Sequence, residues 1–206
     1  MKKLILILVV LITASTLNAQ SFKNGTNIVE VDLGLALYTK VTNDISFRGF
    51  TAQHEGQAVS SVLGLQYERG ITNFLGAGLR ISKQNYFDSS GNNENTEAGS
   101  FDVGLVLNAH FLRAKRVDLY GGVVIGISSL KIDDNNSSAR YEGSGAYLDL
   151  GLGARFYMGN RFFLSPKLQY SNLKVNGDYV NVFNNEVKGE WNANGVKLSI
   201  AAGIKF

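Results

Sequence analysis

Eight segments of the chain place apolar residues at every second position, and this alternation is the feature that most constrains the fold. In the segment 100–112, for example, the apolar positions run from Phe101 to Phe111 in steps of two. A strand points successive side chains to opposite faces, so each segment has one apolar face and one different face. Each segment has about the ten residues, or somewhat more, that a tilted strand needs to cross a bilayer. The segments are Asn27–Tyr38, Val59–Glu68, Phe74–Tyr86, Ser100–Leu112, Val117–Leu130, Gly145–Tyr157, Phe162–Ser171 and Asn192–Phe206.

The connections between these segments alternate between short and long. The short ones are Arg69–Asn73, Arg113–Arg116 and Met158–Arg161. The long ones are Thr39–Ala58, Phe87–Gly99, Lys131–Ser144 and Asn172–Trp191, and they are rich in Asn, Asp, Ser and Gly. Polar residues of these types are typical of solvated loops. With both termini on the short-turn side, the order predicts an even-numbered, antiparallel, up-and-down meander.

The first residues have the pattern of an export signal. Lys2 and Lys3 precede an unbroken apolar run from Leu4 to Ile12, which small and polar residues follow. Such a run is too short to span a bilayer comfortably and is typical of a secretory signal peptide. We expect cleavage after Ala19, which divides the chain into a signal peptide, residues 1–19, and one barrel domain, residues 20–206.

The residues on the face opposite the apolar one indicate which of the two faces lines the interior of the barrel. A soluble barrel encloses its apolar face, whereas an outer-membrane barrel turns it to lipid. Eleven of the 23 glycines lie on the opposite face, where glycine would weaken a solvent-exposed strand for no gain but leaves room inside a narrow barrel. The same face carries six acidic and five basic residues, which would be very costly to bury unless paired. We therefore predict a lumen ion-pair network, with Asp32, Arg80, Asp149 and Lys167 near mid-depth. Its predicted members are Glu30, Asp32, Glu68, Arg80, Asp102, Asp118, Asp149, Arg155, Lys167, Lys197 and Lys205.

Aromatic residues on the apolar face collect at the short-turn ends of the strands. They are Tyr67, Phe111, Phe156, Phe162 and Phe206. In the folded meander these residues come to one height, and a ring of aromatics at one height is what a membrane interface favours. We predict that they form an aromatic belt around a transmembrane barrel.

These features together resemble the small OmpA/OmpX-like outer membrane barrels, and in particular the stand-alone outer membrane protein beta-barrel domain family. The stretches "LGLQYERGITNFLGAGLRIS" and "LGLGARFYMGNRFFLSPKLQYS" carry the resemblance best, and the ending "GVKLSIAAGIKF" resembles the C-terminal assembly signal of such proteins. The resemblance implies an eight-stranded antiparallel transmembrane β-barrel in the outer membrane of a Gram-negative cell, preceded by a cleaved signal peptide. It also implies contact with outer membrane lipid or lipopolysaccharide, and recognition by the barrel-assembly machinery.

Three functions compete. In the first, a non-enzymatic barrel with a largely plugged lumen meets an extracellular ligand through its long loops, in adhesion or surface recognition. The aromatic and basic loop residues that would serve recognition are Phe47, Arg48, Phe50, Tyr179, Phe183 and Trp191. A competing interpretation of the same loops is that alternation such as "DYVNVF" continues as strand and extends the barrel. The second function is a narrow channel for small solutes, and the third is a lipid-modifying membrane enzyme.

The composition of the chain argues against several kinds of binding site and against a catalytic site. The chain has no cysteine and two histidines, His54 and His110, which argues against thiolate or histidine-rich metal sites. Without Lys2 and Lys3 it has 18 basic and 17 acidic residues, and this balance gives no reason to expect nucleic-acid binding. His110 has lumen parity, and we expect it to be a hydrogen-bonded lumen residue and not a catalytic base. We expect no catalytic residue, no metal and no cofactor.

Overall fold

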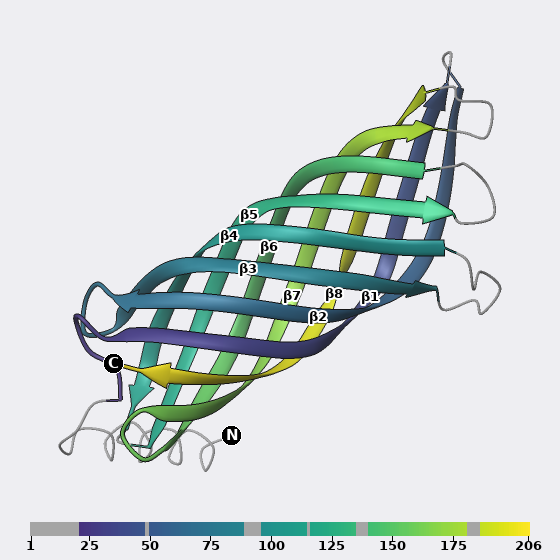
Figure 1. Cartoon of the computed structure of the whole chain (residues 1–206). Coiled ribbons are helices and arrows are strands. Elements are labelled where there is room, and N and C mark those ends of the chain that lie inside the picture. Colours follow the sequence, from purple (N-terminus) through teal and green to yellow (C-terminus); the bar gives the residue numbers. More distant parts are fainter. Residues whose placement is uncertain (1–20, 48–49, 89–95, 115, 135–139, 181–185) are drawn as a thin grey trace, which may run out of the picture.

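The computed structural model describes residues 21–47, 50–88, 96–114, 116–134, 140–180 and 186–206, so the predicted signal peptide lies outside the described residues. The strands are β1 (Asn27–Phe47), β2 (Phe50–Gly70), β3 (Leu75–Asp88), β4 (Thr96–Arg113), β5 (Val117–Asp134), β6 (Arg140–Met158), β7 (Phe162–Val180) and β8 (Glu186–Lys205). Each strand pairs antiparallel with its neighbours along the chain, and β8 pairs with β1, which confirms the predicted eight-stranded, up-and-down closed barrel (Figure 1). Among the described residues, no helix is long and apolar enough to cross a membrane.

The three short connections and the C-terminus lie at one end of the barrel, the short-turn end, and the long connections lie at the other, the long-loop end (Figure 1). Asn27 and Phe206 exchange two backbone hydrogen bonds of 2.9 Å, so the last residue of the chain closes the barrel against the first strand. In the short turn between β6 and β7, Gly159 has a φ of 77°, a left-handed conformation that glycine adopts without the cost it has for other residues.

The outer wall carries a broad apolar band. Leu33 on β1, Leu105 on β4 and Ile127 on β5 are 65%, 68% and 69% exposed, although they belong to the most apolar residue types of the chain. Soluble proteins rarely expose a continuous apolar surface of this kind, whereas a lipid bilayer covers it. The apolar faces of the predicted strands therefore point outward.

Glycine on the inner wall makes room for the large side chains opposite. A Cβ atom at Gly64 would lie 2.6 Å from the Arg80 guanidinium and 2.7 Å from Asp32 Oδ1, which is closer than real Cβ atoms come to other atoms. The missing side chain at Gly64 thus provides the space in which this ion pair sits.

The strands are longer at the long-loop end than the sequence predicts. Strands β1 and β2 continue to the pair Phe47 and Phe50, β7 continues to Val180, and β8 begins at Glu186. Most of Thr39–Ala58 and most of Asn172–Trp191 are therefore strand. The predicted bounds of the long connections are therefore wrong. The competing interpretation, in which alternation continues as strand, is confirmed for the described residues. We call the parts of the strands above the apolar band the rim.

The polarity of the two faces inverts between the band and the rim. In β8, Leu198 and Val196 point outward and Lys197 inward within the band, but Trp191 points inward and Glu190 outward in the rim. Alternation has the same period in both parts of β8, so this strand continues from the band into the rim, whereas β1 has a register shift between Tyr38 and Val41. The rim is therefore a water-facing cylinder with an apolar core, continuous with a lipid-facing cylinder that has a charged core.

Candidate functional site

The interior of the barrel is the candidate site, and Arg155 on β6 lies at its centre. Its side chain is fully buried, with Nη2 at 2.6 Å from Glu68 Oε2 and Nε at 3.4 Å from Glu30 Oε2. The third nitrogen, Nη1, lies 3.4 Å from Asp118 Oδ2. One guanidinium thus joins carboxylates from three strands, β1, β2 and β5.

Two further cations extend this cluster across the lumen. Lys167 Nζ lies 2.7 Å from Glu30 Oε1 and 3.5 Å from Asp32 Oδ1. Arg80 holds Asp32 in a bidentate pair, with both nitrogen–oxygen distances at 2.7 Å. The bidentate geometry is the strongest form of this interaction and fixes both side chains. We call this continuous cluster, together with His110, the charge network: Glu30, Asp32, Glu68, Arg80, His110, Asp118, Arg155 and Lys167.

His110 completes the charge network at the short-turn end. Its Nε2 lies 2.7 Å from Glu68 Oε1, and its Nδ1 lies 2.9 Å from Asp118 Oδ1. A neutral imidazole donates from one nitrogen only, so two carboxylate partners fit an imidazolium, which donates from both. The positive charge also balances the network, which otherwise holds four carboxylates and three permanent cations. His110 is thus a hydrogen-bonded lumen residue as expected, and both of its nitrogens are occupied.

A small apolar cluster closes the barrel below the charge network. The Phe22 ring stacks on the His110 ring with 3.5 Å between centroids and 9° between planes, and Phe22 is fully buried. Ile28, Tyr157 and Phe163 complete the cluster. No sequence pattern pointed to Phe22, because it is a single aromatic residue outside the alternating segments.

Lys205 lies beside this apolar cluster and does not belong to the charge network, so that part of the prediction is wrong. Its Nζ donates to the Ser21 carbonyl at 3.0 Å and lies 4.7 Å from the centre of the Tyr157 ring. Lys205 is the last residue of β8, beyond the depth at which the network carboxylates lie. It therefore ties the N-terminal segment to the end of the barrel.

The remaining predicted lumen residues form separate contacts. Lys197 Nζ pairs with both oxygens of Asp149 at 3.1 Å, apart from the charge network. Asp102 lies within ion-pair distance of no cation among the described residues, so its predicted ion pair is wrong. Its oxygens instead accept hydrogen bonds from Ser128 at 2.6 Å and from Gln84 at 2.9 Å. Hydroxyl and amide donors satisfy the buried carboxylate without a cation.

Apolar and aromatic side chains fill the lumen inside the rim and extend down into the band, where Ala36, Val106 and Val124 lie between lipid-facing neighbours, and we call this set the aromatic core. Tyr86 packs between Tyr38 and Trp191, with ring centroids at 5.8 Å and 5.4 Å. Its buried members are Ala36, Tyr38, Val62, Val106, Val124, Leu130, Tyr141, Tyr147, Leu173, Val175, Trp191 and Ala193. Trp191 is only 7% exposed, so its predicted role as an exposed recognition residue is wrong. The inward parity of the rim places Trp191 inside the barrel.

The described lumen leaves almost no free space between these two fillings. A cavity of about 20 Å³ lies beside Gln66, Asn108 and Lys167, which is room for about one water molecule. An eight-stranded barrel encloses little more than its own side chains. The charge network and the aromatic core together occupy the described lumen.

The predicted belt residues lie on the outer wall near the short-turn end. Tyr67 is 38% exposed, and the other four are between 47% and 63% exposed. The Tyr67 hydroxyl donates to Asn27 Oδ1 at 2.8 Å, which joins β2 to the first residue of β1. The five side chains are thus exposed on the outer wall, and the interface belt stays a prediction.

The predicted recognition residues lie at the far end of the rim. Phe47 and Phe50 pair across the tip of the β1–β2 hairpin, although their side chains, Arg48 and Phe183 lie outside the described residues. Tyr179 on β7 is partly buried and packs against the aromatic core.

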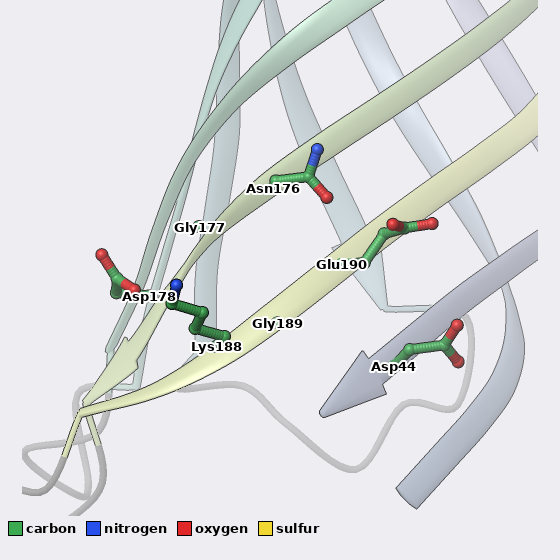
Figure 2. A pocket seen from close by; sticks show the side chains of 7 residues that line it. All are labelled: Asp44, Asn176, Gly177, Asp178, Lys188, Gly189 and Glu190. Atoms are coloured by element: carbon green, nitrogen blue, oxygen red, sulfur yellow. The ribbon is translucent and has the colours of Figure 1, made fainter. Parts of the chain in front are cut away.

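A hollow of about 550 Å³ lies at the rim, where β7, β8 and β1 meet (Figure 2). Asp178 and Lys188 occupy opposing positions on β7 and β8, and Asp44 and Glu190 occupy opposing positions on β1 and β8. Hydrogen bonds from Lys174 and Asn192 lower the pKa of Glu190, so this carboxylate is ionised at neutral pH. The described residues include no group of His, Asp and Glu that could hold a metal ion.

Comparison with known proteins identifies the fold family. The family model described as "Outer membrane protein beta-barrel domain" matches residues 4–206. The chain belongs to this family. The apolar band therefore lies in the outer membrane.

One solved structure shares the fold, and two others have lower TM-scores. The outer membrane protein OprG from Pseudomonas aeruginosa is 16% identical, with a TM-score of 0.69 over 92% of this chain and 99% of that chain. Ail of Yersinia pestis is 15% identical, with a TM-score of 0.45 over 89% of this chain and 99% of that one. Neisserial surface protein A is 15% identical, with a TM-score of 0.48 over 84% and 98%. At these identities, the likeness to OprG shows a shared fold and nothing more. A search among curated proteins finds no match.

Proposed function

We propose that the protein is a non-enzymatic, non-conducting outer membrane barrel whose rim makes contacts at the cell surface. The observation that carries this proposal is that the charge network and the aromatic core both occupy the lumen, while the strands continue above the band as the rim. Conduction needs a path through the charge network and through the aromatic core, and each of these fills the width of the barrel.

The rim supports a role in surface contact. Strand pairing extends above the band in β1, β2, β7 and β8, and the aromatic core supports this extension from inside. A rigid support presents recognition residues at a low entropic cost. Phe47, Arg48, Phe50 and Phe183 are the proposed contact residues, since they belong to the tips of the two longest hairpins.

The buried state of His110 supports a non-enzymatic role. A general base must reach the proton that it abstracts. Carboxylates occupy both His110 nitrogens, and Phe22 covers one face of the ring. This histidine is therefore a structural part of the charge network.

Two measurements test the proposal. Purified protein in planar bilayers is expected to give no sustained single-channel openings, and frequent openings would favour a channel instead. Cells that display the protein are then compared with cells that display a variant trimmed at both tips, residues 44–53 and 178–188, for adhesion to immobilised laminin, fibronectin and heparin. We expect trimming to reduce adhesion to at least one surface, and equal adhesion to all three would contradict the contact role.

A further inference from the structure

A second hollow, of about 610 Å³, lies on the outer wall over β3, β4 and β5, at the upper edge of the apolar band. Gly99 lines the hollow between Asn85 and Lys131, and adds no side chain to it. Phe87 and Phe101, each 53% exposed, stand on its walls. Lys83 and Lys131 line it as well.

Strand register places this hollow at a boundary between two environments. Ile81, Val103 and Ile127 form one cross-strand row of the apolar band. The next row up is Lys83, Phe101 and Ser129, and the row above it is Asn85, Gly99 and Lys131. Successive rows lie about 7 Å apart along the strands, since alternate residues of a strand are that far apart. The hollow therefore spans the change from hydrocarbon to headgroups in the outer leaflet.

Lys83 differs from the other lysines just above the band. Lys40, Lys131 and Lys174 each lie within 3.6 Å of a glutamate, at 3.6, 3.0 and 2.8 Å. Lys83 pairs with no carboxylate of the described residues, although it lies directly above the lipid-facing Ile81. A lysine at this depth has a long apolar stem in the membrane and an ammonium group that needs an anionic partner.

Lys131 can supply a second positive charge to the same ligand. Its ion pair with Glu142 is exposed, with side chains 62% and 50% accessible, and such pairs contribute little. Glu97 and Asp133 line the top of the hollow, one cross-strand row above Gly99 and Lys131. Bases below and acids above favour an anion that sits low, beside Lys83.

We propose that this hollow binds the phosphorylated headgroup of an outer-leaflet glycolipid of the lipid A class. The phosphate lies between Lys83 and Lys131 over Gly99, and an acyl chain follows Phe101, Val103 and Ile81 down the band. Free phosphate would gain nothing from the apolar wall, so the geometry favours the lipid as the source of the anion. The inference depends on the place of the barrel in the outer membrane and is independent of the proposed contact role.

Native mass spectrometry of the full mature chain in detergent, titrated with diphosphoryl lipid A, tests this site. The variant K83Q/K131Q is expected to bind the lipid about thirtyfold more weakly than the unmodified chain, since each lysine near an anionic surface is worth about 1 kcal/mol. The matched control is K174Q/K188Q on β7 and β8, which removes the same amount of positive charge. Like K83Q/K131Q, it removes one lysine that pairs with a glutamate. The control is expected to bind lipid A as the unmodified chain does. All four positions are exposed, and a heat-modifiable gel shift checks that each variant is folded.

Further arms identify the ligand. Lipid A without phosphates is expected to bind the unmodified chain as weakly as diphosphoryl lipid A binds K83Q/K131Q. Inorganic phosphate is expected not to compete with the lipid, and K83R is expected to retain lipid binding. The proposal is overturned if both double variants lose lipid equally, if K83Q/K131Q binds normally, or if the dephosphorylated lipid binds as well as the phosphorylated one. Competition by inorganic phosphate would likewise contradict a lipid ligand.

Discussion

The two halves of the barrel interior solve the same packing problem with opposite chemistry. Within the membrane, charged side chains that are matched almost one to one fill much of the lumen, beside a few aliphatic residues such as Val106 and Val124. In the rim, aromatic and aliphatic side chains fill it. The outer wall changes in the opposite sense, from leucine and isoleucine to lysine, glutamate and asparagine.

This contrast shows that what surrounds the barrel decides which face can be apolar. Lipid covers the outer wall of the band, so apolar residues there need no burial in protein, and the lumen is free to be polar. Water surrounds the rim, so the rim must bury apolar residues inside in order to hold its shape. Substitutions in the two halves should therefore have different costs, which the following predictions examine from the largest effect to the smallest.

The largest effect is expected for Arg155→Gln in the charge network. The substitution leaves the Glu30, Glu68 and Asp118 carboxylates without their shared cation, and breaking a buried ion pair in this way costs about 3–5 kcal/mol. Urea unfolding in lipid vesicles, followed by Trp191 fluorescence, measures the free energy of unfolding. Arg161→Gln, at an exposed turn position, is the control. A loss for Arg155→Gln no greater than for the control would mean that the network does not stabilise the barrel.

The next effect is expected for Leu173→Ala in the aromatic core. Leu173 is 1% exposed, and a buried leucine that is cut to alanine costs about 2–5 kcal/mol, since it leaves a cavity. Leu168 lies on the same strand but faces lipid and is 50% exposed, so Leu168→Ala leaves no enclosed cavity. The same unfolding measurement should give a clearly larger loss for Leu173→Ala. Equal losses would contradict an aromatic core sealed from lipid and water.

A smaller effect is expected for Tyr38→Phe, where the two halves meet. The Tyr38 hydroxyl donates to Gln84 Oε1 at 2.8 Å, and the substitution removes this hydrogen bond while it keeps the ring. Because Ser60 still donates to the same oxygen at 3.1 Å, we expect a loss of about 1 kcal/mol. Ser60→Ala, which removes the other donor, provides the comparison. A loss above that of Leu173→Ala would show that the hydroxyl does more than satisfy Gln84.

The smallest effect is expected at the exposed ion pair of Lys131 and Glu142 on the rim. The hydrogen bond from Lys131 lowers the pKa of Glu142 below its ordinary value of 4.5. A carboxyl whose pKa is lowered by folding adds stability at neutral pH, and this stability is lost as the pH falls through the folded-state pKa. Lys131→Gln should therefore cost a little stability at pH 7 and nothing at an acid pH below the folded-state pKa of Glu142, where this carboxyl is protonated in both states. An equal cost at both pH values would mean that Lys131 acts through packing and not through charge.

The fold was predictable because one physical rule covers the whole membrane band. Apolar alternation located all eight strands, and glycine and matched charges on the other face identified the lumen. Arg155, Glu68 and Lys167 entered the predicted network by parity alone. Their pairing partners were not predictable, because register between neighbouring strands and the reach of each side chain decide which charges meet.

The rim was harder to predict because its polarity is inverted. A search for strands with apolar residues outward ends where the outward residues turn polar, so Trp191 and Tyr179 were assigned to loops. The signal that would have placed them is present: Leu173, Val175, Gly177 and Tyr179 continue the inward parity of Lys167 on β7. Phe22 had no such signal, since only the folded barrel brings it onto His110.

The most direct test of this account is solution NMR of methyl-labelled protein in lipid nanodiscs, which needs no substitution. We expect nuclear Overhauser effects between acyl-chain protons and the methyl groups of Leu33, Leu105 and Ile127, which face outward in the band. We expect none for Leu130 and Leu173, whose methyl groups should instead show contacts to lumen residues and no exchange contacts with water. Lipid contacts at Leu130 or Leu173, or water contacts of the kind that an open channel would give, would contradict the filled, inverted barrel described above.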